Sequence, residues 1–479
     1  MSDYSLPPST RGPVAELAER VVGQGGTDES AMWLLRSSTS AFEARVALFD
    51  SAVETLDVQY FIWQGDPSGH MLLDRLLAAA DRGVRVRLLV DDLSAAGRDR
   101  EFYAFAEHPN VRIRIFNPFR GRASATQAME FSVRFGTLNH RMHNKSIIAD
   151  GRVGVIGGRN IGDRYFGVYD VFVQHDLDIM FAGPAVADVR DSFDEYWNAP
   201  RAVPLRSYLK PQRMRLDLEG LRTELRMQTE ADAGLFAAFD LDDARMWLQD
   251  RDRDFYSGTV DYFDDSADID NLLQRRLKAD LYEYLASAQD EIVISMAYFI
   301  PDEELSGLLE AATGRGVRVV LLTNSVQSNN HMLAHVGYKR SRRRMLAAGV
   351  ELFELRPNAQ YRLAQAVGRV EPGFVGLHTK AAVVDGRHAM IGTANLDPRA
   401  LDINTEAAMT IDSVLLATEL RRQILDATRP ENAWQLQLDP RGRTAWREAD
   451  ELRRSEPVRG LLQRIKMFLY VLIPLKDQA

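Results

Sequence analysis

The chain has 479 residues, of which 46% are hydrophobic, so it can bury a large core and is expected to form two domains. Cysteine is absent, which excludes disulfides, thiolate zinc sites, cysteine nucleophiles and lipidation through cysteine. The formal net charge of −9 argues against a dedicated nucleic-acid binder, because phosphate affinity comes mostly from clustered Lys and Arg.

Residues 1–31 are expected to be a polar N-terminal segment. The first residues, 1–11, contain prolines and lack the apolar core of a signal peptide, so export by the usual route is not expected. No apolar run reaches the roughly twenty residues that a bilayer-spanning helix requires. These features predict a cytoplasmic chain with no membrane-spanning helix.

Residues 32–200 are predicted to form a first domain in which strands alternate with helices. The run Leu56–Ile62 is apolar and β-branched, as in a strand, and leucines at helical spacing follow it at 72–77. Gly83 is expected to end that helix, after which 84–89 and 111–116 have strand patterns.

Residues 201–269 break this rhythm and are predicted to connect the two domains, with a helix around 216–225. The connection ends in an acidic cluster of Asp261, Asp264, Asp265, Asp268 and Asp270. Its spacing matches no known ligand loop for a divalent metal. A solvated loop and a helix-start signal are therefore expected there.

Residues 270–430 repeat the pattern of the first domain. The apolar run 292–300, leucines at 305–309, and strand-like runs ending at Leu322 and Leu355 follow in the same order. Two tandem α/β halves related by pseudo-two-fold symmetry are therefore predicted, with mixed, mostly parallel sheets flanked by helices. A basic cluster at 339–344, on a predicted helix, is either a solvated face or a binding surface for anionic head groups.

The last predicted segment, 431–479, contains a short apolar core with basic flanks at Arg464–Lys476. The core is too short to span a membrane. It is suited either to lie in a membrane interface, with cations near phosphates, or to dock on the protein's own core.

The pattern H-x-K-x-x-x-x-D occurs twice. Its residues, with the asparagine that trails each copy, are His143, Lys145, Asp150 and Asn160, then His378, Lys380, Asp385 and Asn395. The two histidines are 235 positions apart, and so are the two asparagines. A repeat with matching flanks indicates a duplicated functional site.

On a strand, the alternation of side chains places the His and the Lys of each motif on one side. If the halves pack about a pseudo-two-fold axis, both pairs converge. Two ammonium groups and two amides then form an anion site suited to a phosphodiester, and the two histidines supply a nucleophile and a general acid. This set contains no obvious metal ligands, so no metal is expected.

Carboxylates are needed to tune and orient the histidine rings. Glu406 lies 28 positions after His378, and Asp176 lies 33 after His143, each at the start of a predicted strand. Asp150 and Asp385 complete the catalytic motifs, but their odd spacing from the histidines predicts that they face away from the phosphate and hold the local turn.

The two motifs, with the trailing strings Gly157–Asn160 and Gly392–Asn395, resemble those of the phospholipase D superfamily. The strings 140–145, 157–166 and 395–399 resemble its bacterial cardiolipin synthase branch, and the resemblance covers residues 32–475. It implies a two-step, metal-independent and cofactor-free phosphatidyl transfer that conserves the diester without ATP.

The resemblance also implies roles for the motif residues. His143 would be the nucleophile that becomes a phosphohistidine, and His378 the acid and base. Lys145, Lys380, Asn160 and Asn395 would cradle the phosphate, while Glu406 and Asp176 orient the rings. The reverse assignment of the two histidines is nearly as compatible with the pseudo-symmetry.

The implied donor is phosphatidylglycerol or phosphatidylethanolamine, and the acceptor is phosphatidylglycerol, so the partners are phospholipids on the inner face of a bacterial membrane. Nucleic acid is not expected, and whether a partner protein is needed is open. A hydrolase acting on phospholipid or nucleic acid is the alternative, and a non-catalytic lipid-binding relative is a third. Water would have to be excluded from the site. Aromatic residues in the core or lining such a channel are Phe61, Trp63, Tyr165, Phe166, Tyr298 and Phe299.

Overall fold

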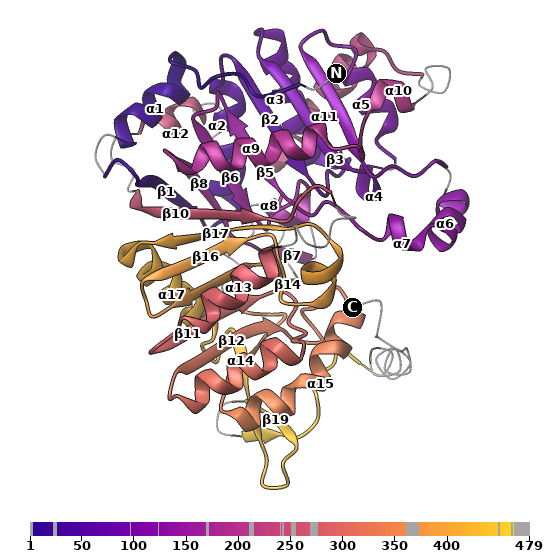
Figure 1. Cartoon of the computed structure of the whole chain (residues 1–479). Coiled ribbons are helices and arrows are strands. Elements are labelled where there is room, and N and C mark those ends of the chain that lie inside the picture. The colour runs from indigo at the N-terminus through magenta and orange to yellow at the C-terminus, as the bar shows by residue number, and fades with distance from the viewer. Residues whose placement is uncertain are drawn as a thin grey trace.

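The computed structural model shows two similar α/β halves stacked on each other (Figure 1). It describes residues 3–22, 26–95, 97–122, 124–168, 172–209, 215–239, 241, 244–250, 255–268, 276–360, 373–448, 451–460 and 463. Asp270 and the segment Arg464–Lys476 lie outside the described residues. In the described part of the chain, no helix has the length and apolar character needed to cross a membrane.

The first half contains strands of the main sheet and the helices between them. The strands are β1 (Ser30–Leu35), β2 (Thr55–Tyr60), β3 (Arg85–Asp91), β4 (Val111–Phe116), β5 (Ser146–Ala149), β6 (Val153–Gly157), β8 (Asp178–Ala182) and β9 (Ala202–Pro204). The helices are α1 (Gly12–Val22), α2 (Ser38–Ser51), α3 (Pro67–Asp81), α4 (Asp92–Ala95), α5 (Asp99–Phe105), α6 (Ser124–Val133), α7 (Phe135–Leu138), α8 (Asp163–Phe166), α9 (Ala185–Asn198) and α10 (Leu205–Tyr208).

The second half repeats this plan. After α11 (Leu218–Asp232), the 3₁₀ turn Ala233–Leu235 and α12 (Ala244–Gln249), its strands are β10 (Tyr256–Asp264), β11 (Glu291–Met296), β12 (Arg318–Asn324), β13 (Glu351–Leu355), β15 (Lys380–Val384), β16 (His388–Gly392), β17 (Ala407–Asp412), β18 (Ala433–Leu438), β19 (Thr444–Glu448) and β20 (Glu451–Arg453). Its helices are α13 (Leu277–Ala286), α14 (Glu303–Gly314), α15 (Met332–Ala348), the π-helix Arg399–Ile403 and α17 (Val414–Ala427).

Equivalent helices of the two halves begin at equivalent capping residues and end at equivalent glycine turns. Asp66 caps α3 by accepting a hydrogen bond from the Gly69 N–H, and Asp302 caps α14 through the Leu305 N–H. The turns that end these helices contain Gly83 and Gly316, whose φ values of 98° and 94° favour glycine. The predicted strand, helix, strand order is therefore confirmed in both halves.

The strands form one mixed sheet that runs through both halves. Its ladders follow the order β9-β4-β3-β2-β5-β6-β8-β1 in the first half and β10-β17-β16-β15-β11-β12-β13-β18-β19-β20 in the second. The mixed α/β class is confirmed. Parallel pairing within it is confined to β2–β4 and β11–β13, so it is less extensive than predicted, because tight hairpins such as β5–β6 require antiparallel neighbours.

The interpretation of the acidic cluster as a solvated loop was wrong for Asp261, Asp264 and Asp265, whereas Asp268 is exposed and lies outside the strands. Asp261 and Asp264 lie within β10, which pairs with β17 of its own half and with β1 of the first half. Asp265 follows β10 and is buried, and its carboxylate accepts a hydrogen bond from the Glu406 N–H. The segment thus supplies the strand at which the two halves of the sheet meet, near the middle of Figure 1.

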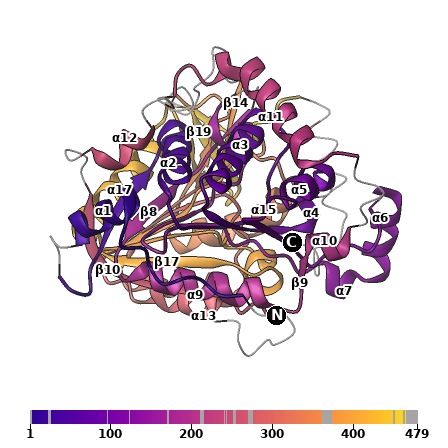
Figure 2. The same ribbon diagram turned by 90° about the horizontal axis from the view of Figure 1, so that it is seen from above.

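The core lies between the sheet and the helices on its faces, as the view from above shows (Figure 2). The strands β2 and β15 are buried along their whole length. In the basic cluster 339–344, on α15, Arg342 is buried against Glu354 and Glu456, Lys339 pairs with Glu456, and Arg344 pairs with Glu303 and Glu310. These three side chains are therefore engaged within the protein, and head groups would have to displace their partners.

Candidate active site

Each histidine motif begins on backbone that pairs with the other half. The His143 N–H donates to the Thr405 carbonyl at 2.9 Å, and Met142 and Thr405 form a parallel bridge. In the same way, the His378 N–H donates to the His175 carbonyl at 2.7 Å. That contact continues the parallel pair of β7 (Phe172–His175) and β14 (Phe374–Leu377). The residue after each carbonyl is a carboxylate of the opposite half.

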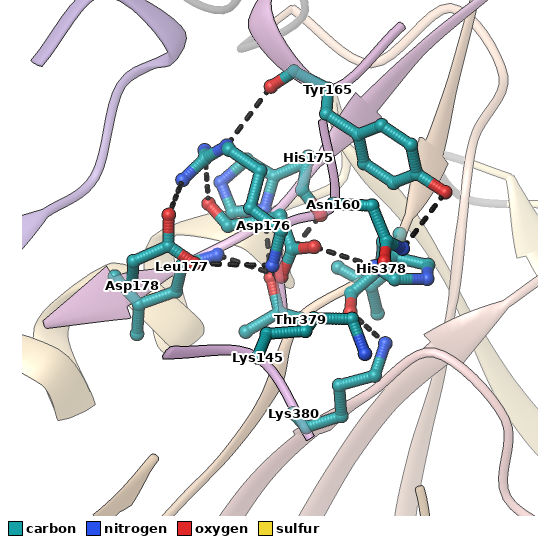
Figure 3. Close-up of polar contacts among 12 residues, drawn as sticks. Lys145, Asn160, Tyr165, His175, Asp176, Leu177, Asp178, His378, Thr379 and Lys380 are labelled. Carbon is teal, nitrogen blue, oxygen red and sulfur yellow. Dashed lines mark hydrogen bonds and ion pairs between the residues drawn. The ribbon is translucent and has the colours of Figure 1, made fainter. Parts of the chain in front are cut away.

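These contacts pair each imidazole with a carboxylate from the other half. His143 Nδ1 lies 2.7 Å from Glu406 Oε2. His378 Nδ1 lies 2.5 Å from Asp176 Oδ2, as Figure 3 shows. Both carboxylates are buried, whereas each histidine keeps a small exposed fraction. The two His–carboxylate pairs, which we call the first dyad (His143–Glu406) and the second dyad (His378–Asp176), therefore each need both halves.

In the sequence, each carboxylate follows the histidine of its own half, and no pairing was predicted from this spacing. Glu406 and Asp176 do face histidines, but across the junction of the halves. The motif histidines also precede their strands, since β5 begins at Ser146 and β15 at Lys380. The extended backbone ahead of each strand is held instead by the opposite half.

The two lysines lie beside both dyads. The ammonium groups of Lys145 and Lys380 each donate to the carbonyl of the histidine two residues earlier. Burial lowers the pKa of Lys145 to about 7 and also lowers the pKa of Lys380, while the carboxylates of both dyads act against this effect. Two poorly solvated cations beside two imidazoles favour an anionic ligand.

The two asparagines differ in their contacts. Asn160 Oδ1 accepts from the Ile62 N–H at 3.1 Å, and its amide nitrogen donates to the Tyr165 hydroxyl. Asn395 is buried, and its Oδ1 has no hydrogen-bond partner among the described residues. Asn395 therefore has more spare hydrogen-bonding capacity at the site than Asn160.

The carboxylates of Asp150 and Asp385 bind backbone N–H groups. Asp150 accepts from the N–H groups of Val53, Glu54 and Thr55, and Asp385 accepts from those of Gln289, Asp290 and Glu291. Both residues have φ of 53°, at the turn of a hairpin. Their contacts hold the start of β2 and β11 against the hairpins that carry the motifs.

The environment of the two dyads is not symmetric. Burial would raise the pKa of Asp176, but the charges of His378, Lys380 and Arg159 outweigh it and lower this pKa to about 2. Burial lowers the pKa of His378 to about 4, so the ground state is a neutral ring beside a carboxylate. In the first dyad, burial raises the pKa of Glu406 to about 8 and lowers that of His143. The second dyad therefore holds a fixed negative charge that the first does not.

Arg159, to which the sequence analysis assigned no role, contributes to this asymmetry after His378 and Lys380. It is fully buried and donates to Asp178, to the carbonyl of Asp176 and to the carbonyl of Tyr165. The repeat places Ala394 at the corresponding position, so the second half lacks this cation. The arginine in the Gly-Gly-Arg-Asn string was the available signal.

Two aromatic side chains contact the histidines. The Phe61 ring lies 4.8 Å from that of His143, and the Tyr165 ring lies 5.4 Å from that of His378. Trp63, Phe166 and Phe299 are buried in the core. Tyr298 donates to Asn330 and is partly exposed. Arg399 is a further cation near His143. Burial lowers the pKa of His143 most, and the charges of Lys145, Lys380 and Arg399 lower it further. Arg399 also donates a hydrogen bond to Asn139 of the first half.

Comparison with known proteins agrees with this geometry. The family model described as "Cardiolipin synthase, PLD-like domain" matches residues 46–197 and 281–427, one match in each half. The chain therefore belongs to this family, and it is an enzyme of the phospholipase D superfamily of the cardiolipin synthase-like type.

Two relatives and one solved structure illustrate the similarity. The chain is 35% identical to cardiolipin synthase C of Escherichia coli K12, over 98% of this chain and 99% of that protein. It is 27% identical to cardiolipin synthase A of Pseudomonas aeruginosa PAO1, over 79% of this chain and 63% of that protein. The crystal structure of phosphatidylserine synthase from Haemophilus influenzae matches with a TM-score of 0.55 at 16% identity, over 86% of this chain and 91% of that chain, and so shows the same fold.

Proposed function

We propose that the chain is a phosphatidyltransferase that forms cardiolipin. Phosphatidylglycerol or phosphatidylethanolamine would donate the phosphatidyl group, and the free hydroxyl of a second phosphatidylglycerol would accept it. The observation that carries this proposal is the pair of dyads, His143–Glu406 and His378–Asp176, joined across the two halves beside Lys145 and Lys380. Similarity to cardiolipin synthases supports the choice of lipids.

In the first step, the ring nitrogen of His143 that does not face Glu406 attacks phosphorus, and the bond to the departing alcohol breaks. A phosphohistidine forms, and His378 gives its proton to the alcohol oxygen. His143 is suited to attack because burial and the neighbouring lysines keep its ring neutral. His378 can take up a proton when the anionic diester is bound, since Asp176 then stabilises the imidazolium.

In the second step, His378 removes the proton from the incoming hydroxyl, whose oxygen attacks phosphorus as the bond to His143 breaks. The diester is remade, so ATP is not needed. Lys145, Lys380, Asn160 and Asn395 would hold the phosphate oxygens. We propose that these side chains supply the charge stabilisation without a metal or cofactor.

The reaction would take place at the inner face of a bacterial membrane, with the chain bound peripherally and without nucleic acid as a substrate. Hydrolysis is the main alternative, because water can replace the acceptor alcohol in the second step. Phe61 and Tyr165 cover one side of each histidine ring and would help to exclude water.

The test is the product profile by mass spectrometry after incubating purified protein with phosphatidylglycerol vesicles, with and without phosphatidylethanolamine. Cardiolipin that disappears in the His143→Ala variant would support transfer, and its dependence on phosphatidylethanolamine would identify the donor. Phosphatidic acid as the sole product would replace transfer with hydrolysis.

A further inference from the structure

A cavity of about 300 Å³ lies behind the second dyad, between the two halves. We call it the rear cavity. Apolar side chains from both halves form most of its wall: Leu177, Leu322, Leu377, Leu420, Ile424 and Ala427. This volume is at the lower end of the roughly 300–1,000 Å³ typical of small-molecule sites.

The rear cavity and the second dyad share the same two backbone segments. His175 and Leu177, which flank Asp176, line the cavity, and so do Leu377 and Thr379, which flank His378. Figure 3 shows His175, Leu177 and Thr379 next to the dyad. A hydrogen bond of 3.1 Å between His175 Nδ1 and Thr379 Oγ1 ties the segments together on the cavity side. A molecule in the cavity would therefore press on the backbone that positions Asp176 and His378.

The first dyad is backed by larger polar side chains. At the position of Thr379 it has Asn144, whose Oδ1 accepts from Thr405 at 3.0 Å. Strand register makes Gln59 the counterpart of Ser295, since Gln59 pairs with Ser146 and Ser295 with Ala381, 235 positions later. Gln59 and Asn144 are each 2% exposed. The smaller Ser295 and Thr379 leave room at the second dyad.

Ser295 presents a hydroxyl to this space. It lines the rear cavity and is 3% exposed. A hydroxyl in a largely apolar wall favours a ligand that supplies a hydrogen-bond partner. The charges near the cavity mouth are mixed, because Arg36 is paired with Glu419 and Asp426 lies at the rim. Burial lowers the pKa of His175 to about 4, so this wall of the cavity is uncharged at neutral pH. The complementary ligand is neutral.

We propose that the rear cavity binds a neutral, single-chain aliphatic alcohol, with its hydroxyl on Ser295 and its chain against the leucines, and that binding is sensed by the second dyad. This inference goes beyond the proposed function and does not depend on it, since the site can be tested without any phospholipid.

Isothermal titration of the full chain with 1-octanol, in buffer without vesicles, tests the binding. One saturable site per chain is expected. Ser295→Gln, which installs the residue of the first half, should abolish binding by filling the cavity, and Ala427→Phe should do so from the opposite wall. Ser295→Ala should keep the apolar contacts and weaken binding by about 2- to 10-fold, the effect of one hydrogen bond. The exposed Ser207→Gln is the matched control and should bind like the wild type.

No saturable binding by the wild type would overturn the site, as would unchanged binding by both filling variants. Ala427→Phe keeps the test decisive if Ser295→Gln does not fold. The coupling is read from imidazole ¹⁵N resonances. Octanol should shift the resonance of His378 and leave that of His143 in place, because Gln59 and Asn144 fill the corresponding space. Equal shifts of both histidines, or none, would contradict the coupling.

Discussion

At the scale of single residues, the carboxylate of Asp176 lies so close to Gly158 that no larger side chain fits at position 158. A Cβ atom added at Gly158 would lie 2.3 Å from Asp176 Oδ1. The carboxylate must therefore move if any larger residue occupies this position, and His378 Nδ1 would lose its partner. The glycine that precedes Arg159 thus helps to set the geometry of the second dyad.

We predict that Gly158→Ala lowers kcat by at least tenfold, because an oriented dyad is worth that much in acid–base catalysis. Circular dichroism should show that the fold is retained. Gly307→Ala, on α14 with open space around the added Cβ, is the matched control and should keep full activity with a stability gain of about 0.5–1 kcal/mol. Full activity of Gly158→Ala would show that the position of Asp176 is not important.

The lowered pKa of Lys145 predicts that the activity depends on pH. Its pKa of about 7 means that the ammonium form, which would bind the phosphate, dominates below pH 7 and is lost as the pH rises. We therefore expect kcat/KM, which reports the free enzyme, to fall above about pH 7. Glu406 ionises in the same range, with a pKa of about 8. Lys145→Arg separates the two effects, because arginine stays charged and should move the fall to higher pH. An unchanged midpoint in this variant would assign the fall to Glu406.

At the scale of elements, the strands and hairpins that carry the motifs were predictable from local patterns. The apolar runs at 56–62 and 292–300, the glycines that end the helices and the odd spacing of Asp150 and Asp385 all indicate structure within one half. The partners of the two histidines were not predictable in this way. Each carboxylate reaches the opposite half through a backbone contact, Thr405 with His143 and His175 with His378, that depends on how the halves pack. The role of β10 was missed for another reason. Tyr256, Val260 and Tyr262 alternate with other residues along it and pack against the core, but the acidic residues of the segment were interpreted as solvated.

Asp150 and Asp385 occupy equivalent hairpin turns, so the effects of substituting them on the stability of the protein can be compared. Asp150 is 1% exposed, whereas Asp385 and the N–H groups it binds are more accessible to water. Asp150→Ala leaves the buried Thr55 N–H and two partly buried N–H groups without this partner, and it should lower the free energy of unfolding by about 1–3 kcal/mol. Asp385→Ala should cost less, since water can replace the carboxylate. Denaturant titration measures both, and equal losses would contradict this ranking.

At the scale of the whole molecule, the two halves share a sheet and an active site. The strand β10 pairs with β1 on one side and β17 on the other, and both dyads cross between the halves. A half of the chain on its own would therefore hold a histidine without its carboxylate. The repeat in the sequence predicted two halves, but only the structure shows that neither contains a complete dyad.

This continuity predicts cooperative unfolding. Differential scanning calorimetry should show one transition, in which the van't Hoff and calorimetric enthalpies agree, although chains of this size often unfold domain by domain. The absence of cysteine removes disulfide exchange as a complication. Two resolved transitions would mean that the shared strand and the crossed dyads contribute little to stability.

The covalent step is the central claim, and a phosphatidyl ester of para-nitrophenol tests it most directly. This leaving group needs no general acid, so His143 should displace it even without His378. In His378→Ala, we predict a burst of one nitrophenolate per active site, followed by a stall, with the phosphatidyl group found on the His143 peptide by mass spectrometry. His143→Ala should show no burst. A burst in His143→Ala with none in His378→Ala would reverse the two roles, and no burst in either variant or in the wild type would contradict the covalent mechanism.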